Sequence, residues 1–355
     1  MTPDWLSTLR CPRCHGALAE TTPGTDDVAR LHCTQCAASW PVRFGIPDLR
    51  PEGVEDPYLT RDEDLRAADR LAERAARGGF EAALEAYYET NERVSASQAR
   101  RFIAGTLAAE ERSRAVVADW QARSGIDGNA DGGTVVDVGC GTGPLLVAAQ
   151  SPNVRLVGLD VGLRWLVLAG ARMRDRGAVA VLACASADRL PLADAAVDVV
   201  ASESLLENVP SAAAAIEEAA RVLRPGGWLR VTTPNRWSVG PDPHIGLPMG
   251  GWLPDRVVSA YAARRGMVPP RRRLLGAGEL RRLMAGAAFD GIRIGPPPVT
   301  DAQRQGASPL IRGAVDAYRV AARSAIGRAA LVAVGPSLIA VARRSGSTQS
   351  LPGRP

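Results

Sequence analysis

The sequence has no lysine, and all 43 of its basic residues are arginine. With 38 acidic residues, the formal net charge is +5. Because Ala and Gly are also abundant, this arginine-only basicity indicates a compositional bias of the genome and does not by itself predict a nucleic-acid partner. The densest basic run, residues 264–282, favours a solvated surface over a site for an anionic partner.

Long apolar runs are also missing, and no stretch of 18 apolar residues could form a spanning helix. The opening residues MTPDWLSTLR have neither a basic region nor an apolar core, so they do not predict a secretory signal. We therefore expect a cytoplasmic protein without stable membrane insertion. Because thiols stay reduced in that compartment, the six Cys are expected to be metal ligands or core residues rather than disulfides.

Four of these Cys form two Cys-x-x-Cys pairs, Cys11 with Cys14 and Cys33 with Cys36, separated by 18 residues. This spacing is typical of a four-thiolate zinc ribbon, whereas a redox Cys-x-x-Cys would need no second pair. Four thiolates close the coordination sphere, so the zinc would be structural. Residues 1–50 contain too few apolar residues to form a stable core without a bound metal or a similar cross-link. We expect them to be an appended module with a core separate from the rest.

The rest of the chain divides by pattern. After a linker at 51–60, the periodicity of residues 61–125 predicts a helical N-terminal cap of two or three helices with a break at 77–79. Residues 126–344 alternate apolar strands with helices, which predicts an α/β domain with a largely parallel, doubly wound sheet. Strands are expected at 134–140, 154–160, 179–185, 196–204, 227–234, 290–295 and 337–344. Residues 235–276 read as a lid loop, and residues 345–355 as a disordered tail.

The string VVDVGCGTG is the most informative stretch, because a buried strand runs into three closely spaced glycines and then a helix. Glycines let backbone N–H groups approach a ligand without Cβ in the way. Asp137 lies in the strand, and Asp160 ends the next strand, 21 residues after Gly139. A carboxylate there can accept both hydroxyls of a ribose. The third glycine, Gly143, comes one residue too early for the dinucleotide-binding pattern.

With these residues the chain resembles the class I S-adenosylmethionine (SAM)-dependent methyltransferases, strongly over residues 130–235 and loosely over 80–343. DVGCGTG resembles the first motif of the family, GLD the second, and ASADRLPLADAAVDVV the third and fourth. The resemblance implies a seven-stranded Rossmann-like sheet and makes residues 126–344 the SAM-binding domain. CPRCHGAL and CTQCAASWPVRFGIPDL resemble zinc-ribbon modules that are fused to methyltransferases or activate them.

The resemblance also implies roles for individual residues. At the adenosine end, Asp160 would hold the ribose, Val161 would pack on the adenine, and Asp188 with the backbone N–H of Ala187 would meet the adenine edge. At the methionine end, SAM would face a second set: Asp137, Gly139, Cys140, Gly141, Gly143, Glu203 and Ser204. Asp137 could equally well organise the loop without contacting SAM. Cys140 could be a small core residue or could line the pocket. Where many relatives carry Glu-His, this chain has Glu207–Asn208, and Asn cannot serve as a base.

A phenol or hydroxyl acceptor often needs a base, and the chain has only His15, His32 and His244. His244 follows the fifth strand and is the catalytic candidate, although a role in which it only caps or fills its Pro- and Gly-rich loop is the more ordinary reading. Trp237 and Trp252 flank it and could line an apolar pocket.

The leading hypothesis is therefore a methyltransferase for a small-molecule acceptor such as a secondary metabolite, quinone or lipid-like compound. The alternative is an rRNA or tRNA base methyltransferase whose zinc ribbon grips RNA. A SAM-binding regulator without activity is a third reading. Nothing in the sequence specifies an oligomeric state.

Overall fold

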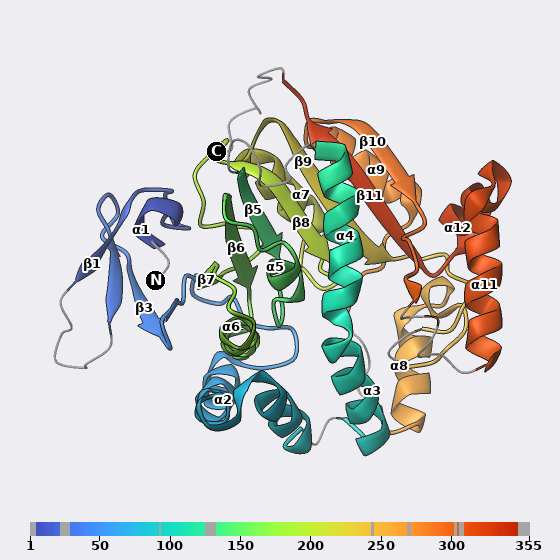
Figure 1. Cartoon of the computed structure of the whole chain (residues 1–355), viewed down its shortest axis with the longest axis horizontal. Helices are drawn as coiled ribbons and strands as arrows, with labels where there is room; N and C mark the ends of the chain where they lie inside the picture. The colour runs from blue at the N-terminus through green and yellow to red at the C-terminus, as the bar shows by residue number, and fades with distance from the viewer. Residues whose placement is uncertain are drawn as a thin grey trace.

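The structure is a computed structural model that describes residues 5–21, 29–91, 94–124, 133–242, 245–267, 271–301, 304 and 309–346. Figure 1 shows a central sheet covered by helices, with a small strand-rich module at one end and the helix pair α11 (Pro309–Arg323) and α12 (Ala325–Val334) at the other. None of the helices in the described part of the chain is long and apolar enough to cross a membrane.

The N-terminal module begins with the short helix α1 (Trp5–Thr8) and continues as a four-stranded antiparallel sheet. Its strands follow chain order: β1 (Leu18–Thr21), β2 (Arg30–Cys33), β3 (Ser39–Arg43) and β4 (Ile46–Pro47). Leu31 and Trp40 bury the inner face of this small sheet. These antiparallel strands fit the small ribbon predicted at the N-terminus.

The module docks on the edge strand of the main sheet, β7 (Val181–Cys184). The N–H of Leu49 donates to the carbonyl of Cys184 at 2.8 Å, and Asp48 forms a parallel β-bridge with Cys184. Leu31, Trp40 and Leu49 belong to the same apolar core as Val181 of the main sheet. The expectation of a separate core was therefore wrong, because a module with so few apolar residues completes its core against the larger domain.

The main sheet has seven strands in the order β10-β11-β9-β8-β5-β6-β7. Its parallel part consists of β5 (Gly133–Val138), β6 (Val154–Asp160), β7, β8 (Val197–Glu203) and β9 (Leu223–Pro234). β11 (Ser337–Arg344) runs antiparallel between β9 and β10 (Phe289–Gly295). This topology confirms the predicted doubly wound, Rossmann-like methyltransferase fold.

Alternate residues of the central strands point to opposite faces, and both faces are apolar. Val136 and Val200 belong to one core, with helices α7 (Ala212–Val222) and α9 (Ala277–Gly286). Val135 and Val199 belong to the other, with α5 (Pro144–Ala148), α6 (Leu163–Arg176) and the cap helices. A parallel strand buried on both faces needs such an unbroken apolar run.

The predicted helical cap consists of α2 (Arg61–Glu89), α3 (Ala96–Leu107) and α4 (Ala109–Ser124). The break predicted at 77–79 is a kink at Gly79, where φ is 73° and ψ is −166°. There the carboxylate of Asp175 on α6 accepts a hydrogen bond from the N–H of Phe80 at 2.7 Å. The second half of α2 thus begins at a side-chain cap supplied by the domain beneath it.

The segment 235–276 is not only a loop, because it contains a 3-10 turn (Gly250–Trp252) and α8 (Asp255–Arg264). Its Pro and Gly residues had hidden both elements from a reading of periodicity. In the arginine-rich run, Arg272 is buried in an ion pair with Asp242, and Arg273 pairs with Glu279 at 2.7 Å. The prediction that this run forms a solvated surface is therefore wrong for Arg272, whereas the side chain of Arg273 is 72% exposed.

We expect Gly79→Ala to destabilise the protein by about 1–3 kcal/mol, because the backbone of Gly79 lies in a region that only glycine adopts readily. A Cβ there would also lie 2.6 Å from the carboxylate of Asp175. Gly105→Ala is the matched control, since that glycine lies inside α3 with no atom within 4 Å of a new Cβ. It should stabilise by about 0.4–1 kcal/mol. Equal effects of the two changes in chemical denaturation would contradict the assigned role of the kink.

Candidate functional site

The glycine loop joins β5 to α5 at the carboxyl edge of the parallel strands, where open α/β sheets bind ligands. Gly139 has φ 77° and donates its N–H to the carbonyl of Leu159 at 2.7 Å. A Cβ on Gly139 would lie 2.9 Å from the side chain of Leu205, whereas a Cβ on Gly141 would meet no atom within 4 Å. The loop is thus closely packed at its first glycine and open at its second.

Asp160 ties this loop to the end of β6. One carboxylate oxygen accepts the N–H of Gly141 at 2.9 Å, and the other accepts the N–H of Gly162 at 2.8 Å. Burial raises the pKa of Asp160 to about 6, although the two N–H donors oppose this shift. The carboxylate is therefore fixed in position, and each oxygen still has a free lone pair.

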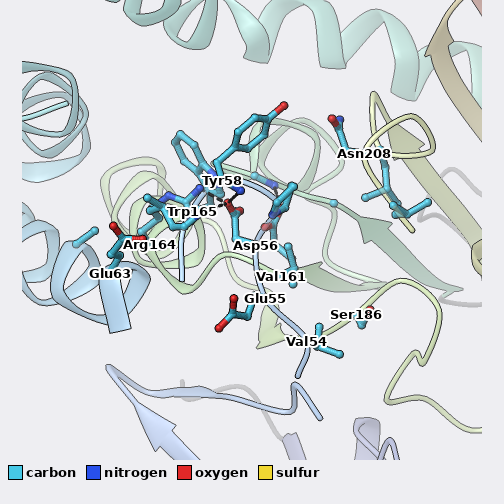
Figure 2. A pocket seen from close by; sticks show the side chains of 18 of the residues that line it. Val54, Glu55, Asp56, Tyr58, Glu63, Val161, Arg164, Trp165, Ser186 and Asn208 are labelled. Carbon is cyan, nitrogen blue, oxygen red and sulfur yellow. Dashed lines mark hydrogen bonds and ion pairs between the residues drawn. The ribbon is translucent and has the colours of Figure 1, made fainter. Parts of the chain in front are cut away.

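These residues open into a cavity of about 980 Å³. Seven of the predicted cofactor residues line it: Gly139, Gly141, Asp160, Val161, Ala187, Asp188 and Ser204. Figure 2 shows Val161 and Ser186 at this part of the wall, with Asn208 across the pocket from Arg164 and Trp165. Residues at the ends of four strands, β5, β6, β7 and β8, and residues of the helical cap therefore meet around one space.

Four other predicted residues, Asp137, Cys140, Gly143 and Glu203, do not line the cavity. Asp137 is 3% exposed. Burial raises its pKa well above the usual range, the carboxylates of Glu203 and Asp160 add to this, and Arg230 opposes it. Glu203 forms an ion pair with Arg230 at 2.9 Å. Cys140 is buried with its Sγ near Gly158 of β6.

The turn after β8 carries Ser204, Glu207 and Asn208. Ser204 has a positive φ of 55°, and its carbonyl accepts a hydrogen bond from the side-chain amide of Asn208 at 2.9 Å. Glu207 is buried and accepts the hydroxyl of Thr233 at 3.1 Å. Burial raises the pKa of Glu207. Asn208 lines the cavity and Glu207 does not, so the residue facing the ligand space here is one that cannot take a proton.

The catalytic candidate His244 lies outside the described residues. Trp237 and Trp252 pack edge to face, with ring centroids 5.2 Å apart, and are 41% and 49% exposed. Neither of them lines the cavity, so a pocket formed by them near His244 stays a prediction. Trp237 instead covers Gly276 at the start of α9.

The linker at 51–60 was given no role from the sequence, yet residues 53–59 line the cavity. The carboxylate of Asp56 fixes the conformation of the linker by accepting hydrogen bonds from the N–H groups of Tyr58 and Leu59 at 2.9 and 3.2 Å. Asp56 also pairs with Arg164 at 3.0 Å. The linker is therefore a wall of the site rather than a flexible spacer.

Behind this wall lies a buried ionic network centred on Arg50. Its guanidinium donates to both oxygens of Asp48 at 2.9 and 2.8 Å and to Asp64 at 3.0 Å. It also donates to the backbone carbonyl of Val161 at 2.9 Å. The side chains of Arg50 and Asp64 are 0% exposed. Arg50 thus joins the end of the N-terminal module to the cofactor side of the cavity.

Asp64 continues the network into α6. It accepts the backbone N–H of Leu163 and the guanidinium of Arg164, both at 2.8 Å. One carboxylate of α2 therefore caps the first turn of α6, directly after Gly162 and Asp160. No local pattern in the sequence signals this contact, because Asp64 and Arg164 lie 100 residues apart.

The four Cys of the N-terminal pairs converge, and their Sγ atoms all lie within 4.8 Å of one another. Cys11 and Cys36 have Sγ atoms 3.7 Å apart, and Cys14 and Cys33 have theirs 3.4 Å apart. A tetrahedral zinc with Zn–S bonds of about 2.3 Å separates its sulfurs by about 3.8 Å. Burial opposes ionisation of Cys33, but the N–H groups of Cys36 and Gln35 lower its pKa to about 6. The donor set fits a closed zinc site.

Residues 136–231 match the family model described as "Methyltransferase domain". An uncharacterized 37.1 kDa protein from a transposon of Streptomyces fradiae is 36% identical over 133 residues, which are 36% of this chain and 38% of that protein. A ubiquinone biosynthesis O-methyltransferase from Leptothrix cholodnii is 33% identical over 114 residues, 31% of this chain and 47% of that protein. The chain thus spans about half the length or less of these curated relatives.

Among solved structures, a SAM-dependent methyltransferase from Thermotoga maritima, titled a possible histamine N-methyltransferase, aligns with a TM-score of 0.43 at 18% identity. The alignment covers 70% of this chain and 95% of that one. With its sheet order and glycine loop, the matched region is a methyltransferase domain of the class I, SAM-dependent type.

We expect Arg50→Met to cost about 3–5 kcal/mol of stability, because it leaves Asp48 and Asp64 buried without their shared cation. Binding of S-adenosylhomocysteine should weaken as well, since Val161 loses its support. Arg61→Met is the matched control: Arg61 pairs with the same Asp48 at 3.0 Å, but its side chain is 32% exposed. Denaturation and titration calorimetry on both variants test this. Arg50→Met behaving like Arg61→Met would contradict the role of the network.

Proposed function

We propose that this protein transfers a methyl group from SAM to a small-molecule acceptor. The observation that carries this proposal is the meeting of the glycine loop, Asp160 and the end of β8 at a cavity with room beyond the cofactor wall. SAM supplies a methyl group activated by a positively charged sulfur. The residues of this chain need chiefly to hold the two reactants in line and keep water out.

For the adenosine end of SAM, the proposed ligands all line the cavity. Asp160 accepts the two ribose hydroxyls with the lone pairs that Gly141 and Gly162 leave free. Val161 packs on the adenine, and Asp188 and the N–H of Ala187 meet its edge. The prior fixing of Asp160 by two backbone donors supports this assignment, because a preordered carboxylate loses little freedom when it binds.

For the methionine end of SAM, we propose that the residues of the glycine loop and Ser204 contact the cofactor. The carboxylates of Asp137 and Glu203 lie behind them and would contribute negative charge. Asp137 is a buried carboxylate whose ionised form is disfavoured by its surroundings. An ammonium group bound nearby would favour the ionised form. The positively charged amino group of SAM would provide such a partner for Asp137.

The acceptor must present a nucleophile without help from residue 208, since the amide of Asn208 takes no proton at neutral pH. A nitrogen, a thiolate or an ionised phenol satisfies this requirement. The role of His244 as a base stays a prediction. The relative named a ubiquinone biosynthesis O-methyltransferase supports a small-molecule acceptor. The alternative of an RNA base stays a prediction as well, and RNA that remains bound through purification at moderate salt would favour it.

We also propose that Cys11, Cys14, Cys33 and Cys36 hold one structural zinc. Four sulfur ligands leave no open position, so the metal would take no part in methyl transfer. It would fold the module that carries Asp48 and Arg50 and so support the cofactor wall from outside.

SAM affinity should depend on pH through Asp160. Ribose hydroxyls donate to the ionised carboxylate, and a pKa of about 6 means that acid removes this acceptor. We expect the Kd to rise about tenfold between pH 7.5 and pH 5. Without cofactor the sign is opposite: a raised carboxyl pKa stabilises the fold at low pH, and this contribution is lost as the pH rises through about 6.

Titration calorimetry at several pH values tests this, with Asp160→Asn as the control. The Asn variant should bind SAM weakly and with little pH dependence over the same range. A wild-type affinity that does not change between pH 7.5 and pH 5 would rule out Asp160 as the ribose ligand.

Freshly purified protein should contain one zinc per chain, and Cys14→Ser should lose it, because three thiolates bind zinc far more weakly than four. Cys184→Ala is the control. That Cys lies in β7 against the module but outside the cluster, so the variant should keep its zinc. Elemental analysis of the three proteins decides the matter, and zinc-free wild-type protein or equal zinc in Cys14→Ser would refute the site.

A further inference from the structure

Aromatic residues gather at one part of the cavity. The chain has only sixteen Phe, Trp and Tyr residues, and five of them line this one space: Tyr58, Tyr87, Tyr88, Phe102 and Trp165. They come from the linker, the end of α2, α3 and the first turn of α6. Four are half-buried and Tyr58 is exposed, so they are not core residues. We call this part of the cavity the aromatic lobe.

Four of these rings form a continuous array. Tyr87 stands edge to face with Tyr88 at 5.0 Å between centroids and lies 4.9 Å from Trp165. Tyr88 lies 5.8 Å from Phe102. Stacking and edge-to-face contacts between aromatic rings occur at these separations. Figure 2 shows Trp165 and Tyr58 on the same side of the pocket, opposite Asn208.

Positive charge accompanies the rings. The guanidinium of Arg164 lies over the ring of Trp165, 4.9 Å from its centroid. Arg66 and Arg70, one turn apart on α2, also line the cavity. Neither of them has an ion-pair partner among the residues that the structure describes.

Carboxylates line the cavity too, but two of the three nearby ones are engaged. Asp56 pairs with Arg164 at 3.0 Å, and Glu63 accepts the N–H of Thr60 at 2.9 Å in the cap of α2. Glu55 is exposed and lies near Val54 in Figure 2. The unpaired charges of α2 that line the cavity are therefore the guanidinium groups of Arg66 and Arg70, which would repel a cationic acceptor from the rings.

We propose that the aromatic lobe binds the methyl acceptor, and that the acceptor is a planar aromatic molecule with an acidic group, such as a phenol or an aromatic carboxylate. This rests on the proposed function. The rings stack on the acceptor, and a guanidinium of α2 pairs with its acidic group. Nearby positive charge also lowers the pKa of a phenol, which supplies the nucleophile that Asn208 cannot generate.

The transfer then balances without a further reactant. The phenol gives its proton to solvent, and the phenolate oxygen forms a bond to the methyl carbon. The bond between that carbon and sulfur breaks, sulfur keeps the electron pair, and the sulfonium becomes a neutral thioether.

The test uses the full-length protein saturated with S-adenosylhomocysteine and three probes in titration calorimetry. The probes are 6-hydroxy-2-naphthoate, its fully saturated decalin analogue, and the cation 2-naphthylmethylammonium. We expect the aromatic acid to bind, and each of the other two to bind at least about fivefold more weakly. Equal affinity for the saturated analogue would overturn the stacking role, and preference for the cation would overturn the charge assignment.

Variants locate the binding. Tyr87→Leu and Trp165→Leu should each weaken the aromatic acid about 2- to 10-fold, whereas Trp237→Leu, an exposed Trp outside the cavity, should have no effect. Arg70→Gln should weaken binding of the aromatic acid but not binding of neutral 2-naphthol.

The affinity for S-adenosylhomocysteine, measured on each variant, separates a local loss of binding from misfolding. If wild-type protein does not bind S-adenosylhomocysteine, the proposed function fails, and the same probes on cofactor-free protein still test the lobe. A uniform effect of all three leucine variants would overturn the proposal.

Discussion

The architecture of the site depends on one buried set of ion pairs, in which Arg50 is held between Asp48 and Asp64 with no exposure to water. Asp48 and Arg50 lie at the end of the N-terminal module, whereas Asp64 lies in the first turn of α2 and contacts the first turn of α6. Burial of charges costs free energy, and it is tolerated only when every charge is paired and hydrogen-bonded. Here Arg50 pairs with Asp48 and Asp64, and Arg164 pairs with Asp56 and Asp64, so the network links the module, the linker and the start of α6.

This constraint explains why the N-terminal module is more than an appendage. Its apolar side chains join the core at β7, and its last residues carry the cation that supports Val161. The linker that follows becomes a wall of the cavity, and the cap helices complete the opposite wall. The sheet edge and the pieces added before it therefore form one cavity, with a cofactor side at the glycine loop and an aromatic side at the cap.

Much of the fold could be predicted from local pattern. The seven strands were expected within a few residues of their positions, because continuous apolar runs bounded by Gly and Pro are a strong signal. The glycine loop and Asp160 could also be predicted, because their spacing along the chain reflects the local geometry of a strand, a turn and a helix. The helix α8 was missed because Pro and Gly weaken periodicity in residues 235–276. The Arg50 network and the lining by Tyr87, Tyr88 and Phe102 were missed because they depend on contacts between residues far apart in the chain, and a single sequence does not specify such contacts.

The central claim is that the cavity is a site for SAM with an acceptor space beside it. Titration of this chain with S-adenosylhomocysteine, in parallel with NAD⁺, tests it most directly, because both ligands carry an adenosine but only one carries a methionine-like chain. One-to-one binding of S-adenosylhomocysteine and no binding of NAD⁺ is the predicted result. Binding of NAD⁺ alone, or of neither ligand, would contradict it.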